Sequence, residues 1–319
     1  METKKYELLI DKTKTIGDSI LFRIRALRDF GHVKKGDLGG WVEREGNLSH
    51  EGNCWVGHEA AVYNKAMVFG DAEVCGAAEV YGEAMVYGKA YVLNHALVFG
   101  YAQIYGDAQV FSRAHVFSSA KVYDSARVYN DAKICGDAQI YGNAKVCDYA
   151  GIYGNARVYD CAMVYGQASV WGDAQIFGNA IVFAEAEIYR EARVYDNAHV
   201  CDARVRDRAH VYDDAGVYGG AQVGGDARIC GNVGLYGDVS IEGDAVIKND
   251  GDYIAFKNWW SSGRYFTWTR SNNKWTAGCF HGTGEELVKK AYKDSEKSGR
   301  EYERAVNYVN EILKDYGNK

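Results

Sequence analysis

A six-residue repeat fills most of this chain and constrains its fold more than any other feature. Between Ala60 and Ala198 every sixth residue is alanine, and valine or isoleucine always stands two places after it. The next residue is Phe, Tyr or Trp in 19 of the 24 units, and Gly, Asp, Asn or Ser usually follows. Residues two places apart share one face of an extended segment, and small polar residues suit turns. Each unit therefore predicts a short strand followed by a corner.

The period predicts a parallel β-helix. A helix is excluded, because successive alanines would fall on different sides of it. Hexapeptide periodicity is typical of a parallel β-helix, with three units in each triangular coil. The same frame runs upstream through Val42, Leu48 and Cys54 and downstream to residue 250, which gives about 34 units and about 11 coils. One five-residue step near Cys201 interrupts it and is either structurally silent or marks a contact.

Composition limits the possible partners. The formal net charge of −6 argues against binding long nucleic acid or an anionic membrane along the whole chain. No apolar stretch resembles a signal peptide or a membrane span, so we expect a cytoplasmic protein. The eight cysteines lack C-x-x-C and zinc-site spacing, so we interpret them as free thiols and predict no metal site. The absence of proline suits a chain whose backbone N–H groups nearly all join a ladder.

The repeat also resembles a known family. Val62 followed by Ala66, and Val68 by Ala72, are similar to the hexapeptide repeats of left-handed β-helix proteins, which include many acyltransferases. Residues 21–56, LFRIRALRDFGHVKKGDLGGWVEREGNLSHEGNCWV, resemble the opening of YdcK-type hexapeptide-repeat proteins, an uncharacterised group found in bacteria and in phage or prophage genomes. The resemblance implies left-handed coils, a homotrimer, and a strand-rich cap on the first coil. The aromatic residue after Val or Ile departs from the family pattern.

The repeat offers no visible site for acyl transfer. The resemblance to left-handed β-helix acyltransferases implies a basic histidine at the active site, often beside a loop that interrupts a coil. No such loop interrupts the repeat between residues 42 and 250. His115, His199 and His210 occupy an outward position that elsewhere carries Gln, Lys or Arg. No nucleotide-binding or hydrolase motif is present. We therefore predict no catalytic residue and no cofactor. An acyltransferase using acetyl-CoA stays an alternative, as does a structural part of a virion or appendage.

The aromatic residues form predicted columns on the outside of the coils. Residues eighteen apart should stack on one face, as in the set Tyr87, Tyr105, Tyr123, Tyr141 and Tyr159. Stacked aromatic pairs stabilise a sheet by about 0.2–1 kcal/mol each. The columns can serve stability alone, become buried between subunits, or bind a carbohydrate or another polymer.

The frame stops near residue 250, and residues 251–319 predict a small α+β module. Three short strands are expected, with turns at Ser262-Gly263 and at 271–273. A capping box at 283–286 begins a helix that should reach about Lys297 and break near Gly299, before a second helix from 300 to 316. The predicted organisation is a β cap at 1–41, a solenoid at 42–250 and this module.

The module holds the candidate ligand site. Between Tyr253 and Gly284 there are four of the seven tryptophans, four basic residues and no acidic residue. Strand alternation places Arg264, Trp268 and Arg270 on one face. The tryptophans can cap the last coil and anchor the helices, or they can form a pocket in which cations hold a phosphate and rings stack on a base. The candidate ligand-binding residues are Trp259, Trp260, Arg264, Tyr265, Trp268, Arg270, Lys274, Trp275 and His281.

Taken together, the sequence predicts an all-β solenoid, a left-handed parallel β-helix with an N-terminal β cap and a C-terminal α+β module. The predicted function is non-catalytic binding of a small, anionic, nucleotide-like ligand by a homotrimer. A phage-encoded sponge against host defence, acting in the host cytoplasm, would have this character. The phage context is implied only by the resemblance.

Overall fold

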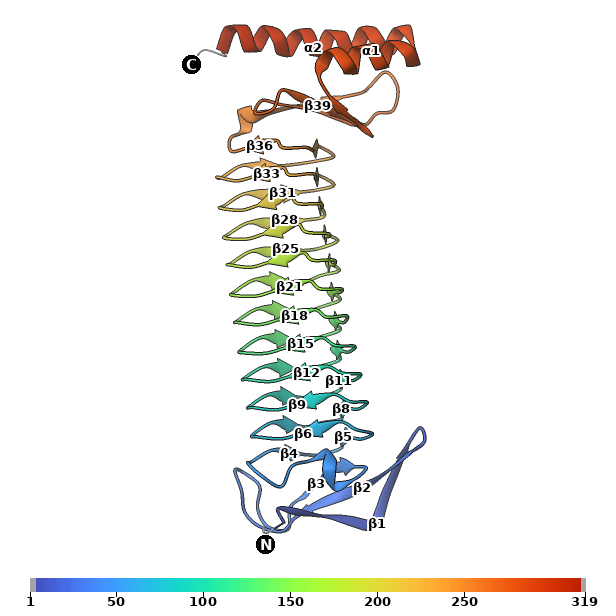
Figure 1. The fold of residues 1–319 in the computed structure, drawn as a ribbon, viewed down its shortest axis with the longest axis vertical. Helices are drawn as coiled ribbons and strands as arrows, with labels where there is room; N and C mark the ends of the chain where they lie inside the picture. The colour runs from blue at the N-terminus through green and yellow to red at the C-terminus, as the bar shows by residue number, and fades with distance from the viewer. Residues whose placement is uncertain (1–3, 317–319) are drawn as a thin grey trace. The chain divides into compact units, whose positions relative to one another are not determined.

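The structure is a computed structural model that describes residues 4–316. The chain divides into two compact units, residues 1–185 and 186–319. Each unit contains short parallel strands arranged in successive coils, and residues 186–319 also contain a sheet and two helices (Figure 1). No helix among residues 4–316 is both long enough and apolar enough to cross a bilayer.

The first unit begins with a β-hairpin. Strands β1 (Tyr6–Ile16) and β2 (Ser19–Ala26) pair antiparallel. Strand β3 (Leu38–Val42) pairs antiparallel with β2 and parallel with β5 (Ala61–Val62), so it joins the hairpin to the solenoid. A short 3-10 helix, η1 (Glu45–Asn47), follows β3.

The solenoid of the first unit has three parallel sheets whose neighbouring strands lie 18 residues apart. The first sheet continues from β5 through β8 (Glu79–Val80), β11 (Leu97–Val98), β14 (His115–Val116), β17 (Lys133–Ile134), β20 (Gly151–Ile152) and β23 (Ser169–Val170). The second contains β4 (Trp55–Val56), β7 (Glu73–Val74), β10 (Tyr91–Val92), β13 (Gln109–Val110), β16 (Arg127–Val128), β19 (Lys145–Val146), β22 (Met163–Val164) and β25 (Ile181–Phe183). The third contains β6 (Met67–Val68), β9 (Met85–Val86), β12 (Gln103–Ile104), β15 (Lys121–Val122), β18 (Gln139–Ile140), β21 (Arg157–Val158) and β24 (Gln175–Ile176).

The second unit contains the same three kinds of sheet. One contains β26 (Glu187–Ile188), β29 (Arg204–Val205), β32 (Gln222–Val223) and β35 (Ser240–Ile241). Another contains β28 (His199–Cys201), β31 (Gly216–Tyr218) and β34 (Gly234–Leu235). The third contains β27 (Arg193–Val194), β30 (His210–Val211), β33 (Arg228–Ile229) and β36 (Val246–Ile247), and a 3-10 helix, η2 (Asp250–Asp252), comes after it. The parallel β-solenoid predicted from the repeat is therefore confirmed.

The repeat positions have the roles that their chemistry predicts. Ala72 and Val74 are both 0% exposed, and the same holds at these two positions along most of the repeat. The following small residue turns the corner in the left-handed backbone region, as at Asn64 (φ 56°), where Asn and Asp are tolerated better than most residues. The outward aromatic rings stack as predicted: the centroids of Tyr105 and Tyr123 lie 4.9 Å apart with an interplanar angle of 1°.

The five-residue step is absorbed at one corner of the second unit. Strand β28 ends at Cys201, Asp202 has a φ of 51°, and Ala203 already occupies the next inward position at 2% exposure. The corner is one residue shorter than the others, and Val205 returns to full burial.

The C-terminal module has four antiparallel strands and two helices. The strands are β37 (Tyr253–Lys257), β38 (Tyr265–Thr269), β39 (Lys274–Ala277) and β40 (Phe280–Gly282), in that order in the sheet. The predicted third strand is thus two strands, because Gly278, at φ 58°, turns the chain within it. Both helices pack on one face of this sheet (Figure 1).

The helices begin and end differently from the prediction in one respect. Helix α1 (Gly284–Asp294) starts at the predicted capping box, in which Thr283 and Glu286 bond each other's backbone N–H groups. The break before α2 (Glu296–Tyr316) lies at Ser295, which is extended, and not near Gly299. Gly299 lies inside α2 because a β-carbon there would come within 2.2 Å of the Tyr292 ring.

Both ends of the repeat are sealed by groups that match the direction of the hydrogen-bond ladder. Three backbone N–H groups in most repeat units donate to carbonyls one coil later, as Trp55 does to Ala72 at 3.0 Å. The first coil therefore has free carbonyls, and the last coil has free N–H groups. Lys5 and Tyr6 donate to the first set, whereas side-chain oxygens of Thr267 and Ser271 accept from the second.

Candidate ligand-binding site

The structure separates the nine candidate residues into buried and exposed groups. Trp268 and Trp275 are each 2% exposed and belong to the module core, together with Phe266, Leu287 and Val309. They face the helices, so they anchor α1 and α2 and are not accessible to a ligand. On the opposite face of the strand, the Thr267 hydroxyl accepts a hydrogen bond from Ser240 N–H of the last coil at 3.4 Å. Threonine, not tryptophan, thus meets the coil here.

An exposed aromatic and basic surface remains beside this core. We call it the tryptophan platform and define it by Lys257, Trp259, Arg264, Tyr265 and Lys297. Trp259 is 69% exposed, and the Lys297 ammonium lies 5.8 Å from the centroid of its ring. The Lys257 ammonium lies 5.9 Å from the centroid of Tyr265. The surface thus combines two exposed aromatic rings, each with an ammonium beside it, and exposed apolar groups rimmed by polar residues mark binding sites.

The loop that carries the platform is held in place by a buried amide. Asn258 is 7% exposed, and its side chain donates to the Tyr302 hydroxyl at 3.1 Å. Its backbone N–H donates to the Arg264 carbonyl at 2.8 Å, and its carbonyl accepts from Gly263 N–H at 2.7 Å. Gly263 has a φ of 68°, which glycine adopts without a steric cost. The loop therefore presents Trp259 and Arg264 from a fixed base.

Trp260 supports the platform from below. Its ring meets Tyr302 edge-on at a centroid distance of 5.2 Å and Trp259 edge-on at 6.0 Å. Its indole N–H is buried and has no hydrogen-bond partner among residues 4–316. Trp260 is half-buried and is therefore part of the packing that orients Trp259.

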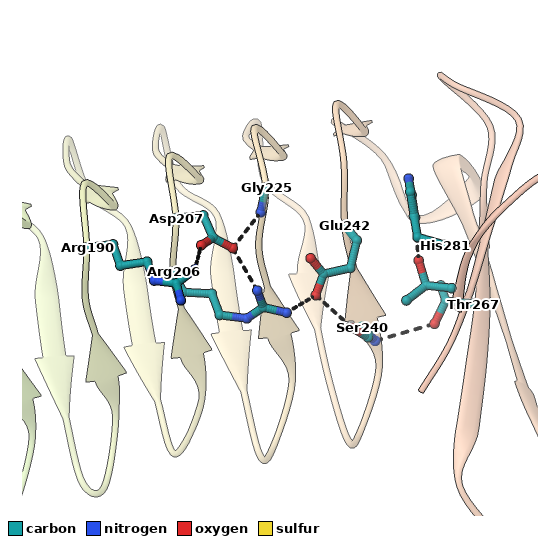
Figure 2. Close-up of polar contacts among 9 residues, drawn as sticks. Arg190, Arg206, Asp207, Gly225, Ser240, Glu242, Thr267 and His281 are labelled. Carbon is teal, nitrogen blue, oxygen red and sulfur yellow. Dashed lines mark hydrogen bonds and ion pairs between the residues drawn. The ribbon is translucent and has the colours of Figure 1, made fainter. Parts of the chain in front are cut away.

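His281 lines a second feature, a cavity of about 230 Å³ whose lining also includes Arg206, Glu242 and Cys279, and the charge of Lys274 acts on His281. Figure 2 shows Arg206 extending from its coil toward Glu242 of a later coil, with His281 contributed by the C-terminal module. Arg206 Nη2 donates to Glu242 Oε1 at 2.5 Å. The imidazole Nδ1 of His281 lies 3.1 Å from the Thr276 hydroxyl oxygen.

A break in the aromatic column creates this polar cluster. The outward position that carries Tyr189 in one coil carries Arg206, Gly224 and Glu242 in the next three. A β-carbon at Gly224 would lie 2.5 Å from Glu242 Oε2, so the missing side chain leaves room for the ion pair to cross that coil. Asp207 also accepts from Arg206, at 2.7 Å, and both guanidinium branches are thereby occupied by protein carboxylates.

Electrostatics and size make the cavity a poor nucleotide site. Burial raises the pKa of Glu242, although the Arg206 charge opposes this. Burial, followed by the Lys274 charge, lowers the pKa of His281, so its imidazole is neutral at pH 7. Ligand pockets for drug-sized molecules usually have volumes of about 300–1,000 Å³. The cavity is smaller than this range, and its arginine is already paired, so the tryptophan platform is the better candidate for a nucleotide-like ligand.

Sequence reasoning found some of these groups and missed others. Trp259, Arg264 and Tyr265 were predicted and are exposed together, whereas Arg270 lies exposed beyond the far end of β38. Lys297 was missed because it belongs to α2, far from the aromatic stretch in sequence. The Arg206–Glu242 pair was also missed, although the loss of an aromatic residue in three successive coils was a visible signal.

Comparison with known proteins gives one short similarity. No protein-family model matches the chain. Over 61 residues it is 38% identical to a protein of Escherichia coli (strain K12) named "Uncharacterized acetyltransferase YdcK". The match covers 19% of this chain and 18% of that protein, so the chain matches less than a fifth of its relative's length. The similarity and the parallel β-solenoid both fit the hexapeptide-repeat superfamily.

Proposed function

We propose that this chain is a non-catalytic binding protein that captures a small, anionic, aromatic ligand of the nucleotide type on the tryptophan platform. The observation that carries the proposal is the 69% exposure of Trp259 beside the Lys297 ammonium. A base stacked on an exposed indole gains about 1–3 kcal/mol. The adjacent Lys297 ammonium supplies a partner for a phosphate.

The charges of the platform favour an anion over a neutral aromatic ligand. The Lys297 ammonium lies beside the Trp259 ring, the Lys257 ammonium lies beside the Tyr265 ring, and Arg264 is an exposed cation between these residues in the sequence. Hydrogen bonds to a charged partner contribute about 1.5–3 kcal/mol each, roughly a 10- to 150-fold change in affinity. The Arg264 guanidinium can form a bidentate pair of hydrogen bonds with a phosphate, which a lysine ammonium cannot.

A panel of mononucleotides and cyclic dinucleotides, screened by the shift in Tm of the full chain, tests the proposal. We expect at least one compound to raise the Tm, and Trp259→Ala and Arg264→Ala to abolish that shift. Arg270→Ala is the matched control, because it removes the same charge at the other end of β38, about 20 Å away along the strand. If no compound in the panel shifts the Tm, the proposal is rejected.

The proposal includes a homotrimer, in which three platforms would occur on one particle. Sequestration without turnover by such a particle would suit a phage-encoded sponge acting in a host cytoplasm. Analytical ultracentrifugation tests the assembly, with a threefold mass expected. A monomer at micromolar concentration would contradict this part of the proposal and leave single-site binding to be judged by the Tm screen.

Acyl transfer is the second candidate, and the similarity to the protein named as an acetyltransferase favours it. His281 would be the candidate general base, because its lowered pKa keeps the imidazole neutral and able to accept a proton. Incubation with acetyl-CoA and a panel of amines and sugars, followed by assay of the released thiol, tests this function. Activity lost in His281→Ala would support it, and the absence of both acetyl-CoA binding and thiol release would exclude it.

A further inference from the structure

A groove runs along one corner of the solenoid in the first unit. Its volume is about 700 Å³, three times that of the cavity beside His281. We call it the corner groove. It is lined by two residues from each of five successive coils, at 76–77, 94–95, 112–113, 130–131 and 148–149. Because strands in neighbouring coils are about 4.8 Å apart, the four steps give a groove about 19 Å long.

The groove coincides with a change in the corner sequence. The left-handed corner position carries Asn94, Ser112, Asn130 and Asp148 in four consecutive coils. The other two corners of these coils mostly carry glycine at this position, as at Gly100. A side chain in this backbone conformation costs about 1–2 kcal/mol for most residues, and less for Asn and Asp. The groove therefore has polar side chains where the rest of the repeat usually has none.

Bonds within the column account for only part of this set. Asn130 donates to the Asp148 carboxylate at 2.8 Å, and that carboxylate also accepts from Gly166 N–H at 3.3 Å. The side chains of Asn94 and Ser112, in contrast, have no hydrogen-bond partner within residues 4–316. Bonds along the column thus leave these two side chains available to a ligand.

The charge of the groove disfavours an anionic ligand. Arg113 is bound by Asp131 through two hydrogen bonds of 2.8 Å, so its charge is already compensated. Asp148 adds a further negative charge. The tryptophan platform, with three cations, has the opposite character. The corner groove therefore suits a ligand that is neutral and both donates and accepts hydrogen bonds.

An exposed aromatic ring completes the groove. Tyr149 is 67% exposed and stands at the last of the five coils. An exposed tyrosine ring has an apolar face and a polar tip, which suits the C–H face and the hydroxyl groups of a sugar ring. Amide, hydroxyl and carboxylate groups at four of the five coils can bond successive sugars, since one β-linked pyranose unit has nearly the length of one coil step.

We propose that the corner groove binds a strand of neutral polysaccharide lying along the coils, with about one sugar per coil. The site differs in location and charge from the tryptophan platform, so the two proposals can fail independently. The ligand class follows from the hydrogen-bonding column, which contains no cation, from the exposed ring and from the extended form of the groove.

Isothermal titration of the full chain with cellohexaose, xylohexaose, chitohexaose and maltohexaose tests the proposal. We expect at least one hexasaccharide to bind, and its disaccharide to bind at least tenfold more weakly because it spans fewer coils. Tyr149→Ala should weaken binding tenfold or more. Tyr101→Ala, which removes a tyrosine that is 61% exposed and outside the groove, should leave it unchanged.

Two sets of results would overturn the proposal. One is the failure of all four hexasaccharides to bind at millimolar concentration, or equal binding by Tyr149→Ala and the unsubstituted protein. The other is preference for a sulfated heparin hexasaccharide over every neutral one, which would identify an anion site. Circular dichroism of Tyr149→Ala establishes that the variant is folded, so a loss of binding is attributable to the groove.

Discussion

The ammonium of Lys5 donates a hydrogen bond to the Cys54 carbonyl over 2.9 Å, although Lys5 is 0% exposed. A buried cation at this place follows from the polarity of the ladder, whose first coil has carbonyls without a preceding N–H. At the other end the polarity is reversed, and the Ser271 hydroxyl accepts from Val246 N–H at 2.7 Å. In this chain, donors therefore meet the first edge of the repeat and acceptors meet the last.

Lys5→Met should destabilise the first unit. The substitution keeps the apolar stem but leaves the carbonyls of Glu51, Gly52 and Cys54 without the ammonium donor. A buried polar group left unsatisfied costs about 1–3 kcal/mol, so we expect a clear fall in Tm and faster hydrogen exchange around residue 54. Lys12→Met, at an exposed position of the hairpin, is the control. Equal Tm values for both variants would contradict this role for Lys5.

Ser271→Ala should loosen the last coil. It removes the acceptor of Val246 N–H, at a cost of about 1–3 kcal/mol if no water replaces it. The expected signature is increased amide exchange at Val246 with unchanged exchange in the first unit. Ser261→Ala, an exposed serine in the platform loop, provides a matched comparison. Unaltered protection of the Val246 amide from hydrogen exchange would contradict the role of Ser271 as its acceptor.

Gly151 and Tyr153 should be energetically coupled. A β-carbon at Gly151 would lie 2.1 Å from the Tyr153 hydroxyl oxygen, because the ring folds back over the strand. Gly151→Ala should therefore lower the Tm of the unsubstituted protein, yet be neutral or favourable in a Tyr153→Ala background, where alanine suits a strand better than glycine. Additive effects in the double variant would mean that the ring does not occupy this space in solution.

The pH dependence of stability should contain a contribution from His281. Its pKa is lowered from 6.5 by burial and by Lys274, while Asp244 acts in the opposite direction. The folded state thus binds this proton more weakly than the unfolded state, and stability should fall as the pH drops from about 7 to about 5. His281→Asn should flatten this part of the Tm profile. Parallel profiles for the two proteins would contradict the assignment.

The fold could be predicted because the repeat fixes both the inward and the outward positions. The alanine and the β-branched residue of each unit are the positions that point inward, and the small polar residue that follows marks the corner. The boundary at Ser295 could not be predicted, since Gly299 is a stronger helix breaker on propensity alone. Its place inside α2 depends on contact with Tyr292, which only the folded module reveals.

The site was less predictable because strand alternation tells which residues share a face but not what covers that face. Trp268 lies in β38 and is buried against the helices, whereas Arg264 comes just before that strand and is exposed. Arg206 and Glu242 are 36 residues apart, and their contact follows from the sequence only when residues are compared from coil to coil.

Isothermal titration of the unsubstituted protein and of Trp259→Ala with the nucleotide that gives the largest Tm shift tests the central proposal most directly. The platform predicts saturable binding by the unsubstituted chain and a loss of affinity of about 5- to 150-fold in Trp259→Ala, the range equivalent to about 1–3 kcal/mol of stacking. Equal affinity of the two proteins would contradict capture on this platform, and so would affinity that falls with Arg270→Ala but not with Arg264→Ala.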